Sequence, residues 1–264
     1  MGCGWLGLPL AKELLDDGYK VKGSTTSLDK IPHLKSVGID AFHVELKQDT
    51  IIGDIENCLF GSAVLILNIP PGLRKHPEAD FVKQMSFLVP YIEKSSIGKV
   101  IFVSSTSVFR DEESIPVITE NTVPNTDTES GKQLFEVEKM LQSNKHFSTT
   151  VLRFSGLFGP NRHPANYLSD KVDVKNPDAP VNLIHLDDCI GIIQNIIQKN
   201  LWNETFNAST TPHLSRKTYY TSVCRAMNLP LPLFEQISLS TGKCIDSEKL
   251  LRLLDYDFKV KLNN

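Results

Sequence analysis

The sequence lacks the patterns typical of disulfide-rich, metal-binding, secreted and membrane-spanning proteins. Its five cysteines are scattered, odd in number and without a C-x-x-C pair, which argues against a disulfide framework or a zinc knuckle. It has no signal-peptide pattern and no apolar run of transmembrane length. The seven histidines are dispersed, and no H-E-x-x-H or carboxylate cluster predicts a metal site. We therefore expect a cytoplasmic protein with no membrane partner and no bound metal.

The charge balance also gives no indication that the protein binds nucleic acid. The net charge is -3, and 22% of residues are charged, so there is no electrostatic case for binding nucleic acid. With 264 residues and 41% hydrophobic residues, the chain can form one large α/β domain, or a nucleotide-binding domain with a small substrate lobe.

Short apolar runs alternate with amphipathic stretches along the chain, which is typical of a parallel sheet covered by helices. We expect strands at 19–23, 39–44, 63–67, 99–103, 149–154 and 181–184. We expect helices at 8–17, 28–37 (capped by Ser27), 80–95, 130–141, 187–198, 215–227 and 247–254. The polar segment 111–128 is predicted to be a long loop.

A glycine motif opens the chain. Gly2-Cys3-Gly4-Trp5-Leu6-Gly7 is a G-x-G-x-x-G that runs directly into a helical pattern. In dinucleotide-binding folds these glycines allow a tight turn, approach of a pyrophosphate and close helix packing, and the phosphates lie at the positive helix end. Such a motif normally follows a buried strand, but only Met1 precedes it here. The sequence thus predicts a sheet whose first strand is missing, with a cost in stability and cofactor affinity.

Three further stretches complete a specific pattern: Val103 to Phe109 (VSSTSVF), Leu152 to Pro160 (LRFSGLFGP) and Asn182 to Asp188 (NLIHLDD). Together with the glycine motif, in this order and spacing, they make the chain resemble the extended short-chain dehydrogenase/reductases of the NAD-dependent epimerase/dehydratase type. The resemblance implies a Rossmann-type doubly wound parallel sheet with a small C-terminal substrate lobe. We expect a nicotinamide dinucleotide-binding domain at 1–160. Residues 161–264 are expected to complete the sheet and form the lobe.

The resemblance also assigns roles to the serines after the predicted strand 99–103. Ser105 matches the hydroxyl that hydrogen-bonds the reacting oxygen of the substrate, where a donor stabilises developing charge. Ser104 is expected at the cofactor and Thr106 at the substrate. The structural alternative is that Ser104 to Ser107 only satisfy backbone groups at a strand end.

The proton relay of that family is absent. It consists of a tyrosine acid/base and, four residues later, a lysine that lowers the tyrosine pKa and holds the nicotinamide ribose. Aligned on Glu138, the sequence has Ser130 at the tyrosine position and Leu134 at the lysine position. Lys132 lies about 200° around the helix from Leu134, so it is no simple replacement. Either another group donates the proton or ordinary dehydrogenase chemistry does not occur.

Other groups on the substrate side could supply the missing chemistry. Tyr167, His163 and Arg162 follow the Gly159-Pro160 turn, and Glu120 lies in the long loop. A histidine or tyrosine in such a loop is more often a surface residue than a catalytic one. Arg162 is the best candidate for binding a phosphate or carboxylate, because a guanidinium recognises these groups bidentately. We therefore predict Arg162 and Tyr167, with Thr106, as substrate-binding residues.

Cofactor preference follows from the end of the second predicted strand. NAD-selective sites usually place an acidic residue there for the ribose hydroxyls. Here Thr26 and Ser27 are followed by Lys30, which favours the 2'-phosphate of NADP over NAD, although Asp29 competes if the register shifts. The remaining predicted cofactor contacts are the glycine motif (Gly2, Gly4, Trp5, Leu6, Gly7) and the loop after the buried strand 63–67 (Asn68, Pro70).

Two functions remain open at this point. The first is an NAD(P)-dependent oxidoreductase or epimerase-like enzyme acting on a small polar substrate, with nucleotide-linked molecules among the candidates. The second is a dinucleotide-binding sensor or scaffold without catalysis. The family resemblance further implies a possible homodimer formed through the helices at 80–95 and 132–141.

Overall fold

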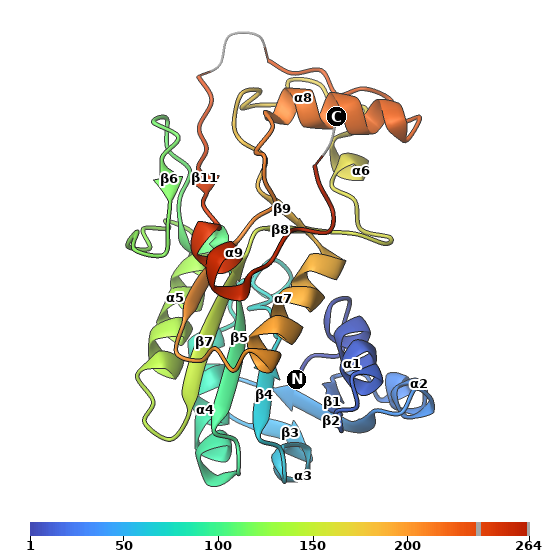
Figure 1. The fold of residues 1–264 in the computed structure, drawn as a ribbon, viewed down its shortest axis with the longest axis vertical. Coiled ribbons are helices and arrows are strands. Elements are labelled where there is room, and N and C mark those ends of the chain that lie inside the picture. Colours follow the sequence, from blue (N-terminus) through green and yellow to red (C-terminus); the bar gives the residue numbers. More distant parts are fainter. Residues whose placement is uncertain (236–238, 263–264) are drawn as a thin grey trace.

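The computed structural model describes residues 1–235 and 239–262, and its centre is a parallel sheet with helices on both faces (Figure 1). Four strands run in the order β10-β7-β5-β4 and are all parallel. They are β4 (Val64–Leu67), β5 (Lys99–Ser105), β7 (Ser148–Phe154) and β10 (Thr205–Ala208). Their carboxyl ends therefore lie on one edge of the sheet, where α/β proteins bind ligands.

The alternation of side chains along β5 separates the two helical layers. Val100 and Phe102 pack into a core shared with α3 (Ile55–Leu59), α4 (Phe81–Lys94) and α5 (Glu129–Gln142). Ile101 points to the opposite face, into a core shared with α1 (Gly7–Asp16), α7 (Leu186–Gln198) and α9 (Glu248–Leu254). This two-sided burial confirms the predicted α/β class with a parallel sheet.

A second, smaller sheet lies beside β4. It contains β1 (Lys22–Thr25) and β2 (Asp40–Leu46) in parallel, with β3 (Ile51–Gly53) antiparallel to β2. Within the described residues, only Met1 to Cys3 run between β1 and β4. The Met1 amine donates to Ile66 O, Asn68 N donates to Met1 O (3.1 Å), and Cys3 N donates to Ser24 O (2.8 Å). This short segment therefore joins the two sheets only at the carboxyl ends of their strands.

Two predicted elements near the amino terminus are corrected by the structure. The strand expected at 19–23 begins at Lys22, because the helix end extends through Gly18 and the Tyr19 amide still bonds to Leu14 O. The single helix expected at 28–37 is a 3-10 turn (Leu28–Lys30) followed by α2 (Ile31–Ser36). A proline in the first turn of α2 sets its start, and the Ser27 side chain makes no capping bond.

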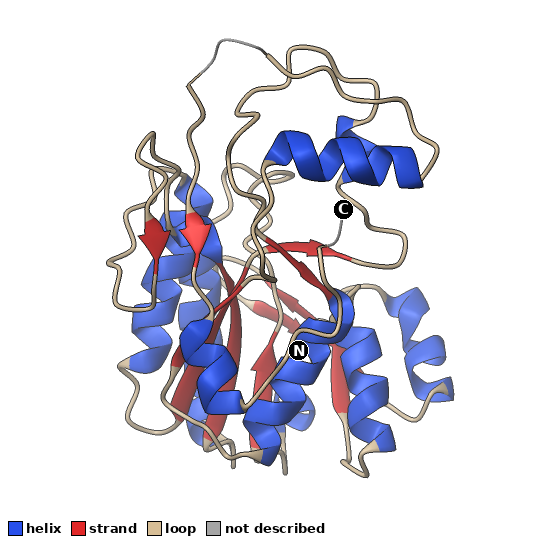
Figure 2. Cartoon of the chain, turned by 45° about the horizontal axis from the view of Figure 1, so that its top comes forward, coloured by secondary structure: helices blue, strands red, loops and turns tan. Residues whose placement is uncertain are grey.

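The upper part of the molecule is mostly loop around α8 (Arg216–Ala226), as Figure 2 shows. It also contains α6 (Ala165–Leu168) and the short pairs β8/β9 (Gly156–Phe158 and Leu183–His185) and β6/β11 (Val117–Ile118 and Cys244–Ile245). The predicted loop 111–128 thus contains β6, and the strand expected at 181–184 is displaced toward His185. Residues beyond 160 both build this lobe and return to the sheet as β10.

A buried carboxylate ties the C-terminal segment to α7. Asp188 is fully buried and accepts bonds from the Tyr256 hydroxyl (2.9 Å), Lys259 N (2.7 Å) and Val260 N (3.2 Å). None of the helices in the described residues is long and apolar enough to cross a membrane.

Candidate functional site

The glycine motif forms a tight loop in which the glycines meet different demands. A Cβ at Gly2 would lie 2.3 Å from Asn68 O, and one at Gly7 would lie 2.1 Å from Gly2 O, so neither position accepts a side chain. Gly2 also has φ +91°, which favours glycine. A Cβ at Gly4 would meet no atom within 4 Å. Packing therefore explains Gly2 and Gly7, whereas Gly4 faces open space that a ligand can enter.

Two polar side chains hold this loop at the carboxyl ends of β1 and β4. Ser24 Oγ accepts from Gly2 N (3.2 Å), and Asn68 Nδ2 donates to Gly2 O (3.3 Å). The helix α1 follows directly, and its N-cap Leu6 makes no side-chain capping bond. Leu8 N donates to Gly4 O (3.0 Å) and Pro9 has no N–H, whereas the N–H groups of Trp5, Leu6 and Gly7 bond to no other backbone group among the described residues. Free N–H groups at the entry to a helix are the arrangement that receives phosphate in dinucleotide-binding folds. The loop therefore fits a dinucleotide.

The residues predicted to contact the cofactor differ in which of their atoms a ligand can reach. Leu6 is buried in the core, so only its backbone can reach a ligand. Trp5 Nε1 donates to Pro160 O (3.0 Å), which fixes the indole beside the loop. At the end of β1, Thr26 and Lys30 are exposed and Ser27 is half-buried. Pro70 is exposed after β4. The structure thus leaves these groups accessible, and their contacts with a cofactor stay predictions.

Ser104 and Ser105 end β5 on opposite faces. Ser104 is buried, and its hydroxyl donates to Glu138 Oε1 (2.6 Å), so this hydroxyl is held in the core and not presented to the predicted cofactor. Ser105 Oγ accepts from Ser107 N (3.1 Å), which leaves its own proton free to donate. Ser105 and Thr106 both line a pocket above the strand ends. The geometry is therefore compatible with the donor role predicted for Ser105.

The structure shows what occupies the positions of the missing relay. Ser130 lies in the first turn of α5, and Leu134 is 4% exposed in the core beneath it. Lys132 is exposed. A Cβ on Gly131 would lie 2.5 Å from Ser107 O, so α5 begins directly against the Ser105 loop. The place of the relay lysine is thus filled by a leucine whose removal would leave a cavity, and no lysine replaces it.

The other residues proposed for acid/base chemistry or substrate binding do not line the Ser105 pocket. Glu120 accepts a bond from Asn207 N (2.8 Å). The His163 ring stacks on Tyr219, and burial, then the neighbouring His185, lower the pKa of His163. Tyr167 is 75% exposed. The Arg162 guanidinium lies 4.9 Å from the centre of the Trp5 ring, beside the glycine loop. None of these residues lines the pocket, and the predicted substrate contacts of Arg162 and Tyr167 stay untested.

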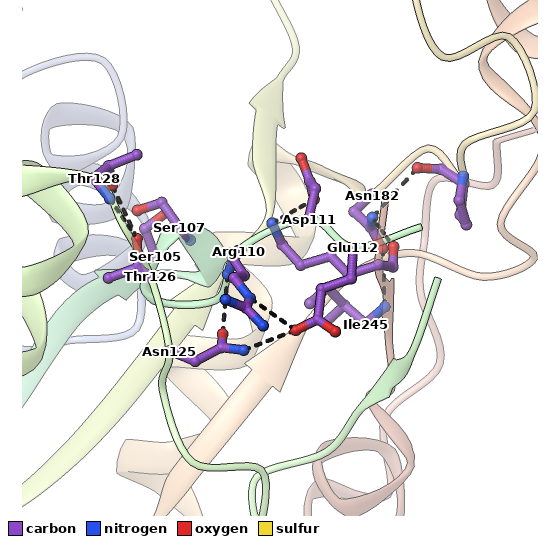
Figure 3. Close-up of polar contacts among 12 residues, drawn as sticks. Ser105, Ser107, Arg110, Asp111, Glu112, Asn125, Thr126, Thr128, Asn182 and Ile245 are labelled. Carbon is purple, nitrogen blue, oxygen red and sulfur yellow. Dashed lines mark hydrogen bonds and ion pairs between the residues drawn. The ribbon is translucent and has the colours of Figure 1, made fainter. Parts of the chain in front are cut away.

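The pocket itself has a volume of about 320 Å³ and a lining that is about half polar. Figure 3 shows four of its polar residues: Ser105, Ser107, Asp111 and Asn182. One wall is the segment 241–243, whose Lys243 Nζ pairs with Asp111 Oδ1 (2.8 Å). Asn182 supports this wall by donating to Lys243 O (2.7 Å) and accepting from Ile245 N (3.0 Å). These bonds give Asn182 a structural role at the pocket.

Sequence reasoning missed Arg216 and Lys243, which also line the pocket. Neither residue lies in a motif, and both come from segments far from Ser105 in the chain. No group of three or more His, Cys, Asp or Glu side chains suited to a metal ion occurs among the residues that the structure describes.

Comparisons with known proteins give one close sequence relative and several similar folds. No family model matches the chain. Protein YeeZ of Escherichia coli (strain K12) is 31% identical over 262 residues, which are 98% of this chain and 94% of that protein. A functionally unknown conserved protein from Silicibacter pomeroyi has a TM-score of 0.78 at 16% identity, over 98% of this chain and 92% of that one. The UDP-glucuronic acid 4-epimerase of Bacillus cereus, solved in complex with NAD, has a TM-score of 0.77 at 17% identity, with the same coverage of 98% and 92%.

Proposed function

Since the chain belongs to the family of protein YeeZ and has the fold of the extended short-chain dehydrogenase/reductases, we propose that it binds a nicotinamide dinucleotide and acts on a small polar substrate. The reaction class is that of an oxidoreductase or an epimerase-like enzyme. The observation that carries the proposal is the glycine loop, in which Gly2 and Gly7 are required by packing while Gly4 faces open space at the start of α1.

Residues from several elements would hold the cofactor. The N–H groups at the start of α1 would receive the pyrophosphate, with Asn68 and Ser24 keeping the loop in place. When bound, the nicotinamide supplies a site that accepts or returns a hydride. Ser105 would donate its free hydroxyl proton to the reacting oxygen of the substrate and stabilise charge there. We propose NADP as the preferred cofactor, because the hydroxyls of Thr26 and Ser27 and the amine of Lys30, which follow β1, can bind a 2'-phosphate. The UDP-glucuronic acid 4-epimerase of Bacillus cereus was solved with NAD.

The missing relay supports a second candidate, a dinucleotide-binding sensor without turnover. Positioned acid/base catalysis contributes about 10²–10⁴ in rate. With Ser130 and the core residue Leu134 in the relay positions, this contribution must come from a group outside α5 or be absent. An enzyme and a sensor differ in hydride exchange, not in cofactor binding.

The first test is titration with NADPH and NADH, followed by nicotinamide fluorescence, in the wild type and in Gly4→Val. The variant should keep its melting temperature, because a Cβ at Gly4 meets no atom within 4 Å beyond its chain neighbours, and it should lose nucleotide binding because the added methyl groups occupy the space open to the ligand. Gly98→Val is the matched control, since a Cβ there also meets nothing within 4 Å. Absence of binding of either nucleotide to the wild type, or undiminished binding by Gly4→Val, would refute the proposal.

The second test separates the two candidates. For the enzyme, hydride exchange between nicotinamide and a carbonyl or alcohol substrate should fall in Ser105→Ala with cofactor binding unchanged. For the sensor, wild type and Ser105→Ala should bind the cofactor equally and neither should exchange hydride.

A further inference from the structure

Among the residues that the structure describes, Arg216 is a cation at the wall of the Ser105 pocket with no carboxylate beside it. It is the first residue of α8, and its side chain lines the pocket. Among the described residues it forms no ion pair, and its Nε is buried without a hydrogen-bond acceptor. A buried charged donor without an acceptor is costly, so an acceptor from outside the described protein atoms is expected there.

The surroundings of Arg216 favour an anion in that place. The guanidinium lies 6.0 Å from the centre of the Tyr220 ring, which holds its planar group at the pocket wall. The N-terminus of α8, capped by Ser215, adds positive potential at the same point. The other cation of the pocket, Lys243, is already paired with Asp111, the one carboxylate of the lining. Arg216 is therefore the cation left to bind a ligand.

The segment 241–245, called the strap below, limits the size of the molecule that the pocket can hold. Gly242 and Glu112 exchange two backbone hydrogen bonds, each 2.9 Å long. Thr241 N donates to Asn176 Oδ1 (3.1 Å), and Asn182 fixes the strap at Lys243 and Ile245. The pocket is open to solvent on one side, and its volume of about 320 Å³ is at the lower end of the range for small-molecule sites. The pocket thus suits a molecule with about one ring.

We infer that Arg216 binds the anionic group of a small substrate, a carboxylate or a phosphate on a molecule of about one ring, whose reacting oxygen lies at Ser105. The inference rests on the proposed function for the role of Ser105, but binding at Arg216 is independent of the cofactor. Two N–H groups of a guanidinium pair with two oxygens of either anion, which makes the contact stronger than a neutral hydrogen bond.

The experiment measures binding without nicotinamide, by calorimetry, with four probes: glucuronate, glucose 6-phosphate, glucose and UDP-glucose. The wild type should bind glucuronate, glucose 6-phosphate or both, and bind neutral glucose far more weakly. Arg216→Gln should weaken the anion by about 10- to 100-fold, as expected for a lost charged hydrogen-bonding partner. Arg216→Lys, which keeps the charge but not the planar fork, should fall in between. Lys217→Gln is the matched control, because it removes an exposed positive charge from the same turn of α8.

The outcomes are decisive in both directions. Preference for glucuronate or for the phosphate identifies which anion the site takes, and a loss confined to the Arg216 variants supports the inference. Equal affinity in wild type and Arg216→Gln overturns it, as does binding of neither anion by the wild type. Tighter binding of UDP-glucose than of both one-ring anions overturns the size limit. Failure of the proposed function would appear separately, as absence of nicotinamide binding with anion binding intact.

Discussion

Filling the gap between β1 and β4 should stabilise the protein. The two strands face each other across a largely apolar slot of about 430 Å³. Its walls include Leu10 and Leu14 of α1, together with Ile66 and Ile197. The Met1 amine bonds to Ile66 O, so the carbonyl of Ile66 points into the slot, and by the two-residue period of a strand that of Val64 does too. We predict that five apolar β-branched residues added before Met1 will form a parallel strand there.

The expected gain can be estimated per residue. Burial of an apolar side chain contributes about 2 kcal/mol, and a backbone hydrogen bond to a neighbouring strand about 1 kcal/mol. Ordering a residue costs about 1.5 kcal/mol, and areas taken from an extended chain overestimate burial, so roughly 1 kcal/mol per residue remains. Five residues then give about 5 kcal/mol, which raises the melting temperature on the order of 10 °C in a chain of this size. The extension also replaces the Met1 amine, whose pKa is lowered by burial, with an amide.

Scanning calorimetry of three proteins tests this prediction: the chain as given, the apolar extension, and an extension of equal length made of glycine and serine. The polar extension provides the same backbone but no side chains for the slot. Hydrogen exchange should show new protection at Lys22 to Ser24 and Val64 to Ile66 only in the apolar form. Equal melting temperatures for the two extensions would refute the reasoning, because they would show that the slot does not accept a strand.

Three further changes test the buried polar groups. Glu138→Gln should destabilise the protein by about 3 kcal/mol in chemical denaturation, because it leaves a buried arginine without its carboxylate, whereas Glu136→Gln on the exposed face of α5 should change little. His163→Phe should lose less stability than the wild type as the pH falls below about 6.5, since the lowered folded pKa of His163 means that the unfolded chain binds the proton more readily. Identical pH profiles would contradict this sign. Asp188→Asn should cost about 2 kcal/mol and speed proteolysis of the C-terminal segment, while Asp187→Asn, at an exposed side chain, should leave cleavage unchanged.

The sequence predicted the elements whose burial is set by local pattern. The strands β4, β5 and β7 are short apolar runs, and their observed bounds differ from the predicted ones by at most two residues. The glycine motif could be interpreted because packing and ligand approach demand glycine at fixed spacing. Ser27 was misassigned as a cap, because a nearby proline, not the serine, sets where α2 begins.

The pocket could not be predicted in the same way, because its parts are joined only by the fold. Arg216, on α8, and Lys243 line the same pocket as Ser105, and Lys243 lies on a segment that two backbone bonds between Gly242 and Glu112 help to hold. Such bonds carry no side-chain signature, and the pairing of β6 with β11 involves residues more than a hundred positions apart. For this reason the sequence predicted an irregular loop at 111–128, although Glu112 in that segment holds Gly242 through two backbone hydrogen bonds.

The segments that contribute the pocket residues also bear on how the chain could catalyse a reaction without a tyrosine–lysine pair on α5. A tyrosine and lysine on α5 would place acid/base chemistry at the start of that helix, where Ser130 and the buried Leu134 now lie. The charges that this chain does place at the pocket, Arg216, Lys243 and Asp111, come from the lobe side. If the chain is catalytic, groups from the lobe supplement the Ser105 hydroxyl on β5, and Lys243→Met should lower hydride exchange with cofactor binding unchanged. Unaltered exchange in that variant would contradict a role for Lys243 in the reaction.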